Sequence, residues 1–142
     1  MQREKSLMIL VAGPYRSGTN DDPQLIAANV KAMTDAALEI YKLGHLPVLG
    51  EWFALPLIEA AGSKKMGDDI FNKIFHPVAV QLIDHCDAVL RIGGPSAGAD
   101  EMINTGKAKN KTIFYGVKEI PVINSAFNTW WSFTFPASGT SF

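Results

Sequence analysis

The chain has 142 residues, of which 47% are hydrophobic and 19% are charged, and its formal net charge is -1. This size and composition predict one globular domain, residues 1–142, with a substantial core. The near-neutral charge gives no electrostatic reason to expect binding to a nucleic-acid polymer or an anionic membrane, because proteins that bind these usually carry a basic face.

The cysteine content and the N-terminus favour a cytoplasmic protein. The chain has one cysteine, Cys86, so it cannot form an internal disulfide, and its three histidines show no zinc-ligand spacing. The start MQREKSLMILVA superficially resembles a signal peptide, but its apolar run is short and lacks an A-x-A cleavage site. We therefore expect a reducing, cytoplasmic setting, no membrane segment and no bound metal.

The first half of the chain predicts a strand, a helix and a second strand. Residues 7–12, LMILVA, are an uninterrupted apolar run, which is typical of a strand covered on both faces. A helix starts at Asp22 and Pro23, continues with apolar residues at helical spacing, and ends at Gly44. Residues 46–49 form a short second strand, and GEWFALP after it is compatible with a loop or a short helix.

The second half repeats this alternation. Residues 61–69 predict a mobile loop, 69–85 a helix bent or restarted at Pro77, 87–92 a third strand, 99–109 a helix and 112–117 a fourth strand. The alternation predicts a flavodoxin/Rossmann-like three-layer α/β sandwich with right-handed crossovers and a mainly parallel four- to five-stranded sheet. The aromatic C-terminal tail, residues 118–142, is expected to add an edge strand or to cover a subunit interface.

Two glycine-rich loops follow the first and third predicted strands: GPYRSG at 13–18 and GGPSAGADE at 93–101. Ligands of open parallel sheets bind beyond the carboxyl ends of the strands, so one pocket can be lined by both loops. In the first loop, the glycines allow close backbone approach, Arg16 offers a forked donor, and Ser17 and Thr19 add hydroxyls, which suits a phosphate or a ribose. The alternative is a sharp turn with a solvated arginine.

Neither loop matches a standard nucleotide motif. The first lacks the lysine of a P-loop, and neither reads G-x-G-x-x-G. In the second loop, Asp100 and Glu101 stand at a helix start, where acids are common because the helix end attracts negative charge. Their functional interpretation is a carboxylate at the mouth of the pocket that acts as a nucleophile or stabilises an oxocarbenium ion.

The layout MILVAGPYR, then DAVLRIGGPSAGADE, a helix and KTIFYGV resembles the nucleoside 2-deoxyribosyltransferase-like superfamily, which includes the deoxynucleotide N-hydrolases. The resemblance covers residues 7–117. It implies cleavage or transfer at the N-glycosidic bond of a nucleoside or nucleoside 5′-monophosphate through a carboxylate nucleophile, without a metal or organic cofactor. It also implies a homodimer or larger homo-oligomer, because pockets in similar enzymes are often completed by a second subunit.

The resemblance also assigns roles to residues. The candidate catalytic residues are Glu101, Asp100 and Tyr15, and the candidate substrate-binding residues are Gly13, Pro14, Arg16, Ser17, Gly18, Glu51, Trp52, Ser96 and Gly98. Tyr15 and Arg16 would contact the sugar and any 5′-phosphate, which Ser17, Gly18 and Ser96 would help to hold. Trp52 is a candidate for stacking on the base and Glu51 for hydrogen bonding to base or sugar, although each is also compatible with a structural or rim position.

The chain departs from the family pattern at one position. The family glutamate usually falls four residues after the glycine that corresponds to Gly98, where this chain has Met102. Glu101 is one residue earlier, which rotates a helical side chain by about 100°. Three alternatives follow: a compensating shift of the helix, a nucleophile supplied by Asp100 or Glu101, or loss of catalysis. The last would leave a non-catalytic nucleotide-binding or sensing module.

Overall fold

The sheet of this protein is parallel throughout. The computed structural model describes residues 5–123, and in this range four strands lie in the order β2-β1-β3-β4. They are β1 (Met8–Ala12), β2 (Leu46–Val48), β3 (Ala88–Arg91) and β4 (Thr112–Phe114). Leu10 in the central strand β1 pairs with Val48 on one side and with Val89 on the other. The strand order reverses between β1 and β3, which is where ligands bind in doubly wound sheets.

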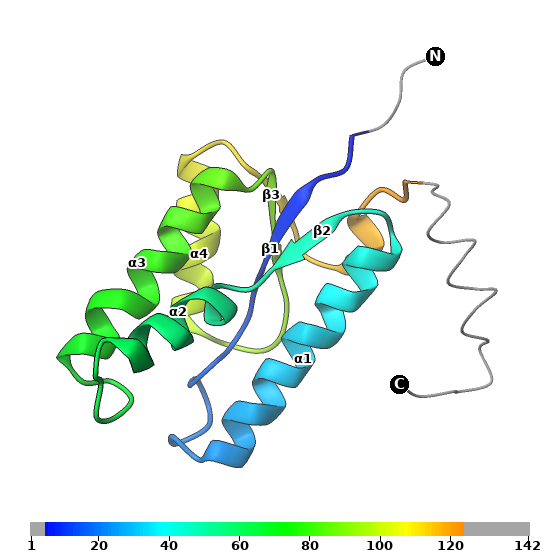
Figure 1. Cartoon of the computed structure of the whole chain (residues 1–142). Coiled ribbons are helices and arrows are strands. Elements are labelled where there is room, and N and C mark those ends of the chain that lie inside the picture. The colour runs from blue at the N-terminus through cyan, green and yellow to red at the C-terminus, as the bar shows by residue number, and fades with distance from the viewer. Residues whose placement is uncertain (1–4, 124–142) are drawn as a thin grey trace.

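Helices cover both faces of this sheet (Figure 1). They are α1 (Pro23–Lys42), α2 (Gly50–Ala60), α3 (Asp69–His85) and α4 (Ala97–Ala108), and a short 3-10 helix, η1 (Val117–Glu119), follows β4. Helix α1 packs with η1 against one face, whereas α3 and α4 pack against the other. Helix α2 lies beside α3. The molecule therefore has the predicted three-layer α/β architecture.

The alternation of side chains along β1 builds the two cores. Ile9 and Val11 point to the α1 side and pack with Met33, whereas Leu10 and Ala12 point to the side of α3 and α4. Both sets are buried, as expected for a strand whose two faces are covered. The continuous apolar run at residues 7–12 is thus explained by its central place in the sheet.

Most predicted elements are confirmed, and the structure resolves two open points. The segment GEWFALP is the start of helix α2, and α3 is one helix that contains Pro77. Residues 118–123 form no edge strand; Ile120 instead packs against the α1-side core. The rest of the tail, residues 124–142, lies outside the described residues, so the expected edge strand or interface there stays a prediction. Within residues 5–123, no helix is both long and apolar enough to span a membrane.

Candidate active site at the carboxyl edge of the sheet

A cavity of about 250 Å³ lies at the predicted point where the strand order reverses. Its inner wall is formed by residues 10–13 at the end of β1, and its sides by the starts of α2 and α4 and by the face of α3 that carries Asn72, His76 and Ala79. Both glycine-rich loops contribute, through residues 15–17 of the first and through Ser96 and Gly98 of the second. The two loops therefore line one cavity.

Direct contacts hold the two loops together. The Ser17 hydroxyl donates a hydrogen bond to the Ser96 hydroxyl oxygen at 3.0 Å. Ser96 is also the N-cap of α4, because its Oγ accepts from the Ala99 N–H. On the other side of the loops, Gly93 has φ +80°, and a Cβ built there would lie 2.6 Å from Cδ of Pro14. The close approach of the loops thus requires a glycine at position 93.

The turn after Arg16 presents backbone donors. Thr19 is 2% exposed, and its Oγ1 donates to the Arg16 carbonyl and accepts from the Asp21 N–H. Gly18 has a φ of +74°, and Asn20 and Asp21 have φ of 54° and 59°, which are tolerated best by glycine, asparagine and aspartate. The backbone N–H groups of residues 16–18 have no hydrogen-bond partner within the described part of the chain. Unpaired N–H groups in such a turn can hold an anion.

Arg16 stands at the rim of the cavity with its position fixed. Its Nε and Nη2 donate to the two carboxylate oxygens of Asp21 at 2.9 and 3.0 Å, and its guanidinium lies 5.7 Å from the ring centroid of Phe71. This hydrogen-bonded pair raises the pKa of Arg16 and lowers the pKa of Asp21. The side chain is 36% exposed and lines the cavity, so its positive charge faces an incoming anion from a preset position.

Glu51 is the carboxylate that lines the cavity, among the residues described. It lies in the first turn of α2, where the preceding residue, Gly50, packs so closely on α3 that a Cβ there would lie 3.1 Å from Cβ of Ala79. Burial raises the pKa of Glu51 above its ordinary value. The pKa of Tyr15 is also raised, first by burial and then by the negative charge of Glu51. A carboxyl group and a phenol thus face the same cavity.

The acids of the second loop point elsewhere. Asp100 is 65% exposed in its side chain and pairs with Nε of Arg91 at 3.1 Å. Glu101 is 61% exposed and lies 2.9 Å from Nε2 of His76. Met102, only 7% exposed, lines the cavity. Neither Asp100 nor Glu101 is among the residues that line the cavity, and their expected role at its mouth stays a prediction.

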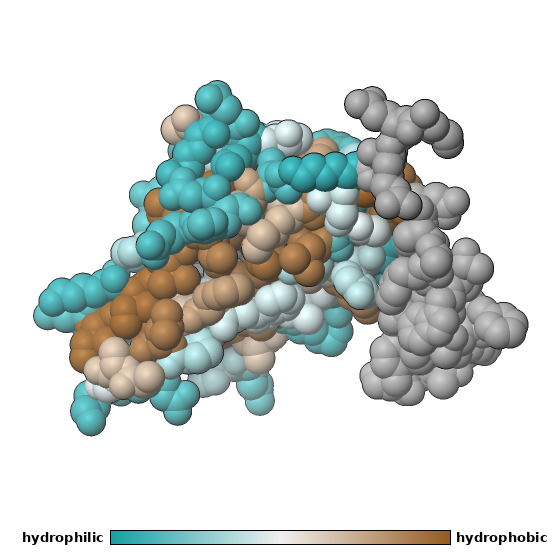
Figure 2. Space-filling model, turned by 45° about the horizontal axis from the view of Figure 1, so that its top comes forward, coloured by the Kyte–Doolittle hydropathy of each residue, from teal (hydrophilic) through white to brown (hydrophobic). Residues whose placement is uncertain are grey.

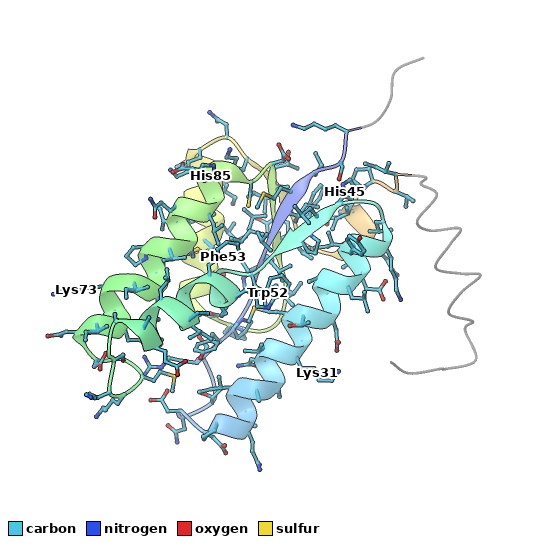
Figure 3. All side chains as sticks on the ribbon, viewed as in Figure 1. Lys31, His45, Trp52, Phe53, Lys73 and His85 are labelled. Carbon is cyan, nitrogen blue, oxygen red and sulfur yellow. The ribbon has the colours of Figure 1, made fainter. Side chains whose placement is uncertain are left out.

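Three further predicted binding residues lie beside the cavity and not in its lining. Pro14 packs against Gly93, and Gly18 provides the left-handed turn after Ser17. Trp52 is 43% exposed and lies next to Phe53 at the start of α2 (Figure 3). The remaining predicted binding residues Gly13, Arg16, Ser17, Glu51, Ser96 and Gly98 all line the cavity, together with Tyr15.

Sequence reasoning missed the contribution of α3. Asn72, His76 and Ala79 follow each other at helical spacing and line the cavity with Phe75, whose ring centroid lies 5.0 Å from that of Tyr15. Residues 72, 76 and 79 share one helix face, but the sequence alone does not indicate that this face borders the cavity. In contrast, Cys86 is buried on the sheet side of α3, and burial raises its pKa to about 11, so it is not a reactive thiol.

Comparison of the chain with protein-family models and with curated proteins finds no match. Within residues 5–123, no three histidine, cysteine, aspartate or glutamate side chains are grouped so that they could hold a metal ion.

Proposed function

We propose that the cavity binds a nucleoside 5′-monophosphate and that the protein cleaves its N-glycosidic bond with the help of the Glu51 carboxyl group. The observation that carries this proposal is the position of Glu51 in a cavity bordered by two phosphate-compatible loops. The resemblance to nucleoside 2-deoxyribosyltransferase-like proteins supports the substrate class. Because Met102 lines the cavity where the resemblance expects a glutamate, we assign the essential carboxyl to α2 and not to α4.

Each group of the cavity has a part in this reaction. The N–H groups of residues 16–18, the Arg16 guanidinium and the hydroxyls of Ser17 and Ser96 would bind the phosphate. Tyr15 would contact the sugar. Because burial raises the pKa of Glu51, this carboxyl holds its proton at higher pH than a solvated one and would protonate the leaving base.

Release of free base tests the proposal. The protein is incubated with a panel of ribo- and deoxyribonucleoside 5′-monophosphates, and the base is measured by chromatography. Glu51→Gln is expected to lower kcat by 100-fold or more, because general acid catalysis contributes about 10²–10⁴-fold, while nucleotide binding is kept. Glu59→Gln, on an exposed position of the same helix, is the matched control and should leave the rate unchanged. Equal rates in the two variants would refute the role of Glu51.

A second candidate is a nucleotide-binding or sensing module without turnover. Met102 favours it, because an apolar side chain occupies the cavity position where the resemblance expects a nucleophile. This candidate predicts a thermal shift with nucleoside 5′-monophosphates but no base release by the wild-type protein. The same incubation therefore separates the two functions.

The expected homo-oligomer also remains a proposal. Trp52, Phe53 and Leu57 are exposed apolar residues of α2, and Figure 2 shows a band of hydrophobic residues on one face of the molecule. Burial of α2 against a second copy would remove this apolar surface from water. Light scattering at micromolar concentration tests the assembly, and a monomer mass would contradict it. The cytoplasmic location likewise stays a prediction, to be tested by cell fractionation.

A further inference from the structure

The strongest unassigned feature of the cavity is a histidine–carboxylate pair that joins two helices. Nε2 of His76 on α3 lies 2.9 Å from Oε2 of Glu101 on α4. His76 lines the cavity, whereas Glu101 lies behind the imidazole and is largely in solvent. The arrangement has the order cavity, imidazole, carboxylate, with the carboxylate within ion-pair distance of one ring nitrogen.

The placement of His76 distinguishes this pair from a simple link between helices. The same two helices are already joined at their other end by the ion pair of Asp84 with Lys109, which is not part of the cavity lining. With Nε2 facing Glu101, Nδ1 is the ring nitrogen that remains, and it has no hydrogen-bond partner among residues 5–123. One ring nitrogen therefore faces the Glu101 carboxylate, and the other has no protein partner within this range.

His76 also lies close to the groups of the proposed reaction. It precedes Ala79 by one helical turn, and Ala79 is the residue on which the start of α2 packs at Gly50, next to Glu51. The titratable and charged groups that share the cavity with His76 are Tyr15 and Arg16 after β1 and Glu51 on α2. A carboxyl group and an imidazole, carried by two packed helices, thus border one space.

We propose that His76 is the general base that activates a water molecule for attack on the sugar, and that Glu101 is its positioning residue. This inference rests on the proposed function. The water oxygen forms a bond to C1′ as Nδ1 of His76 takes a water proton. The C1′–N bond breaks, its electron pair stays on the base nitrogen, and the Glu51 carboxyl gives that nitrogen its proton. Free base and sugar 5-phosphate are the products, and His76 later returns its proton through solvent to Glu51.

This assignment makes the protein a hydrolase rather than a transferase. Direct attack by water forms no covalent sugar intermediate, so a second base has nothing to attack. The prediction differs from that of a carboxylate nucleophile, whose glycosyl intermediate passes the sugar to an acceptor base. Exchange of labelled base into the nucleotide therefore separates the two mechanisms.

The experiment uses the full-length chain and three variants. His76→Asn is expected to lower kcat for base release by 100-fold or more with the nucleotide Kd within about threefold. Glu101→Gln is expected to lower kcat by about tenfold with KM within about threefold of wild type, because the carboxylate acts through the imidazole and does not contact the nucleotide. Asp84→Asn breaks the other ion pair between the same helices and should leave both kcat and KM unchanged.

The outcomes distinguish failure of the His76 assignment from failure of the proposed function. Loss of activity in His76→Asn, a lowered kcat with unchanged KM in Glu101→Gln and no incorporation of labelled base support the assignment. Base release that persists in His76→Asn, or labelled base appearing in the nucleotide, overturns it and leaves the proposed function standing. No base release from any nucleotide by the wild-type protein overturns the proposed function and this assignment together.

Discussion

Glu51 is held in a position that favours its neutral form. Burial raises its pKa, so between its ordinary pKa and the raised value the folded chain binds a proton that the unfolded chain releases. The free energy of unfolding therefore falls as the pH rises through this interval, and the loss persists at neutral pH. Such a loss of stability is typical of functional sites, where burial shifts the pKa of a catalytic group and lowers the free energy of unfolding.

Glu51→Gln is therefore expected to stabilise the protein near neutral pH. A neutral amide avoids burial of a negative charge, and the rise in Tm at pH 7 should be about 2–4 °C. The difference from wild type should shrink as the pH falls towards about 4, where the carboxyl is largely protonated in both states. Thermal unfolding of both proteins between about pH 4 and pH 8 measures this, and a difference that does not change with pH would contradict the assigned cause.

At the residue scale, the spacing of apolar residues in α4 predicts the buried face of this helix better than its motif does. Ala99, Met102, Ile103 and Gly106 are the buried residues of this helix and follow the spacing i, i+3, i+4, i+7. That spacing places Asp100 and the following glutamate on the opposite face, as observed. The motif comparison directed attention to acids, whereas the helical period already indicated that Met102 faces inward.

At the scale of elements, the site depends on close contact of the loops after β1 and β3. Gly93 is the residue at which they touch, because a side chain there would meet Pro14 and because its φ is +80°. Its neighbour Gly94 has open space around its Cβ position and no positive φ. The two adjacent glycines thus form a matched pair in which only one is required by the structure.

Gly93→Ala is expected to destabilise the fold by about 1–3 kcal/mol, because strain at a positive φ and displacement of Pro14 both oppose it. The displaced loop carries Arg16 and Ser17, so nucleotide affinity should fall as well. Gly94→Ala should change the free energy of unfolding by less than about 0.5 kcal/mol. Urea unfolding and nucleotide titration measure both effects. Similar behaviour of the two variants would show that the loops do not depend on this contact.

Elements were predictable where one physical signal dominated. The apolar run of β1 and the Asp22–Pro23 start of α1 were both identified from the sequence, and the Asp22 side chain does accept from the Gln24 N–H. Helix α2 was ambiguous because it has no side-chain cap and contains Pro56. The role of α3 in the cavity was not predicted, because the face that a helix presents depends on packing against α2 and α4, which local sequence does not specify.

At the scale of the whole molecule, the fold has a stabilising end opposite the candidate site. The start of β1, the turn between α1 and β2, and residues 120–123 meet at the amino end of the central strand (Figure 1). The Ile123 N–H donates to the Leu43 carbonyl at 2.8 Å, and the Ser6 hydroxyl donates to the Gly44 carbonyl at 2.9 Å. Hydrogen bonds thus join segments that are distant in sequence, at the end of the sheet far from the cavity.

His45 is the residue that links these segments. It is 2% exposed; its Nδ1 accepts from the Leu7 N–H at 3.0 Å, so its Nε2 carries the proton that is donated to the Pro121 carbonyl at 2.6 Å. Sequence reasoning did not single out this histidine, because its two partners are 38 and 76 positions away along the chain. The contact exists only once the sheet has assembled.

His45→Ala is expected to lower the free energy of unfolding by about 2–4 kcal/mol, because it leaves a cavity and two backbone groups without their partner. His85→Ala, at an exposed position near the end of α3 (Figure 3), is the matched control and should change it by less than about 0.5 kcal/mol. Because His45 lies at the end of the sheet opposite the cavity, nucleotide affinity of the folded variant should equal that of wild type. Urea unfolding with a parallel nucleotide titration tests both statements. A loss of affinity without a loss of stability would mean that this end of the sheet acts on the site, and that the separation between the stabilising end and the candidate site is wrong.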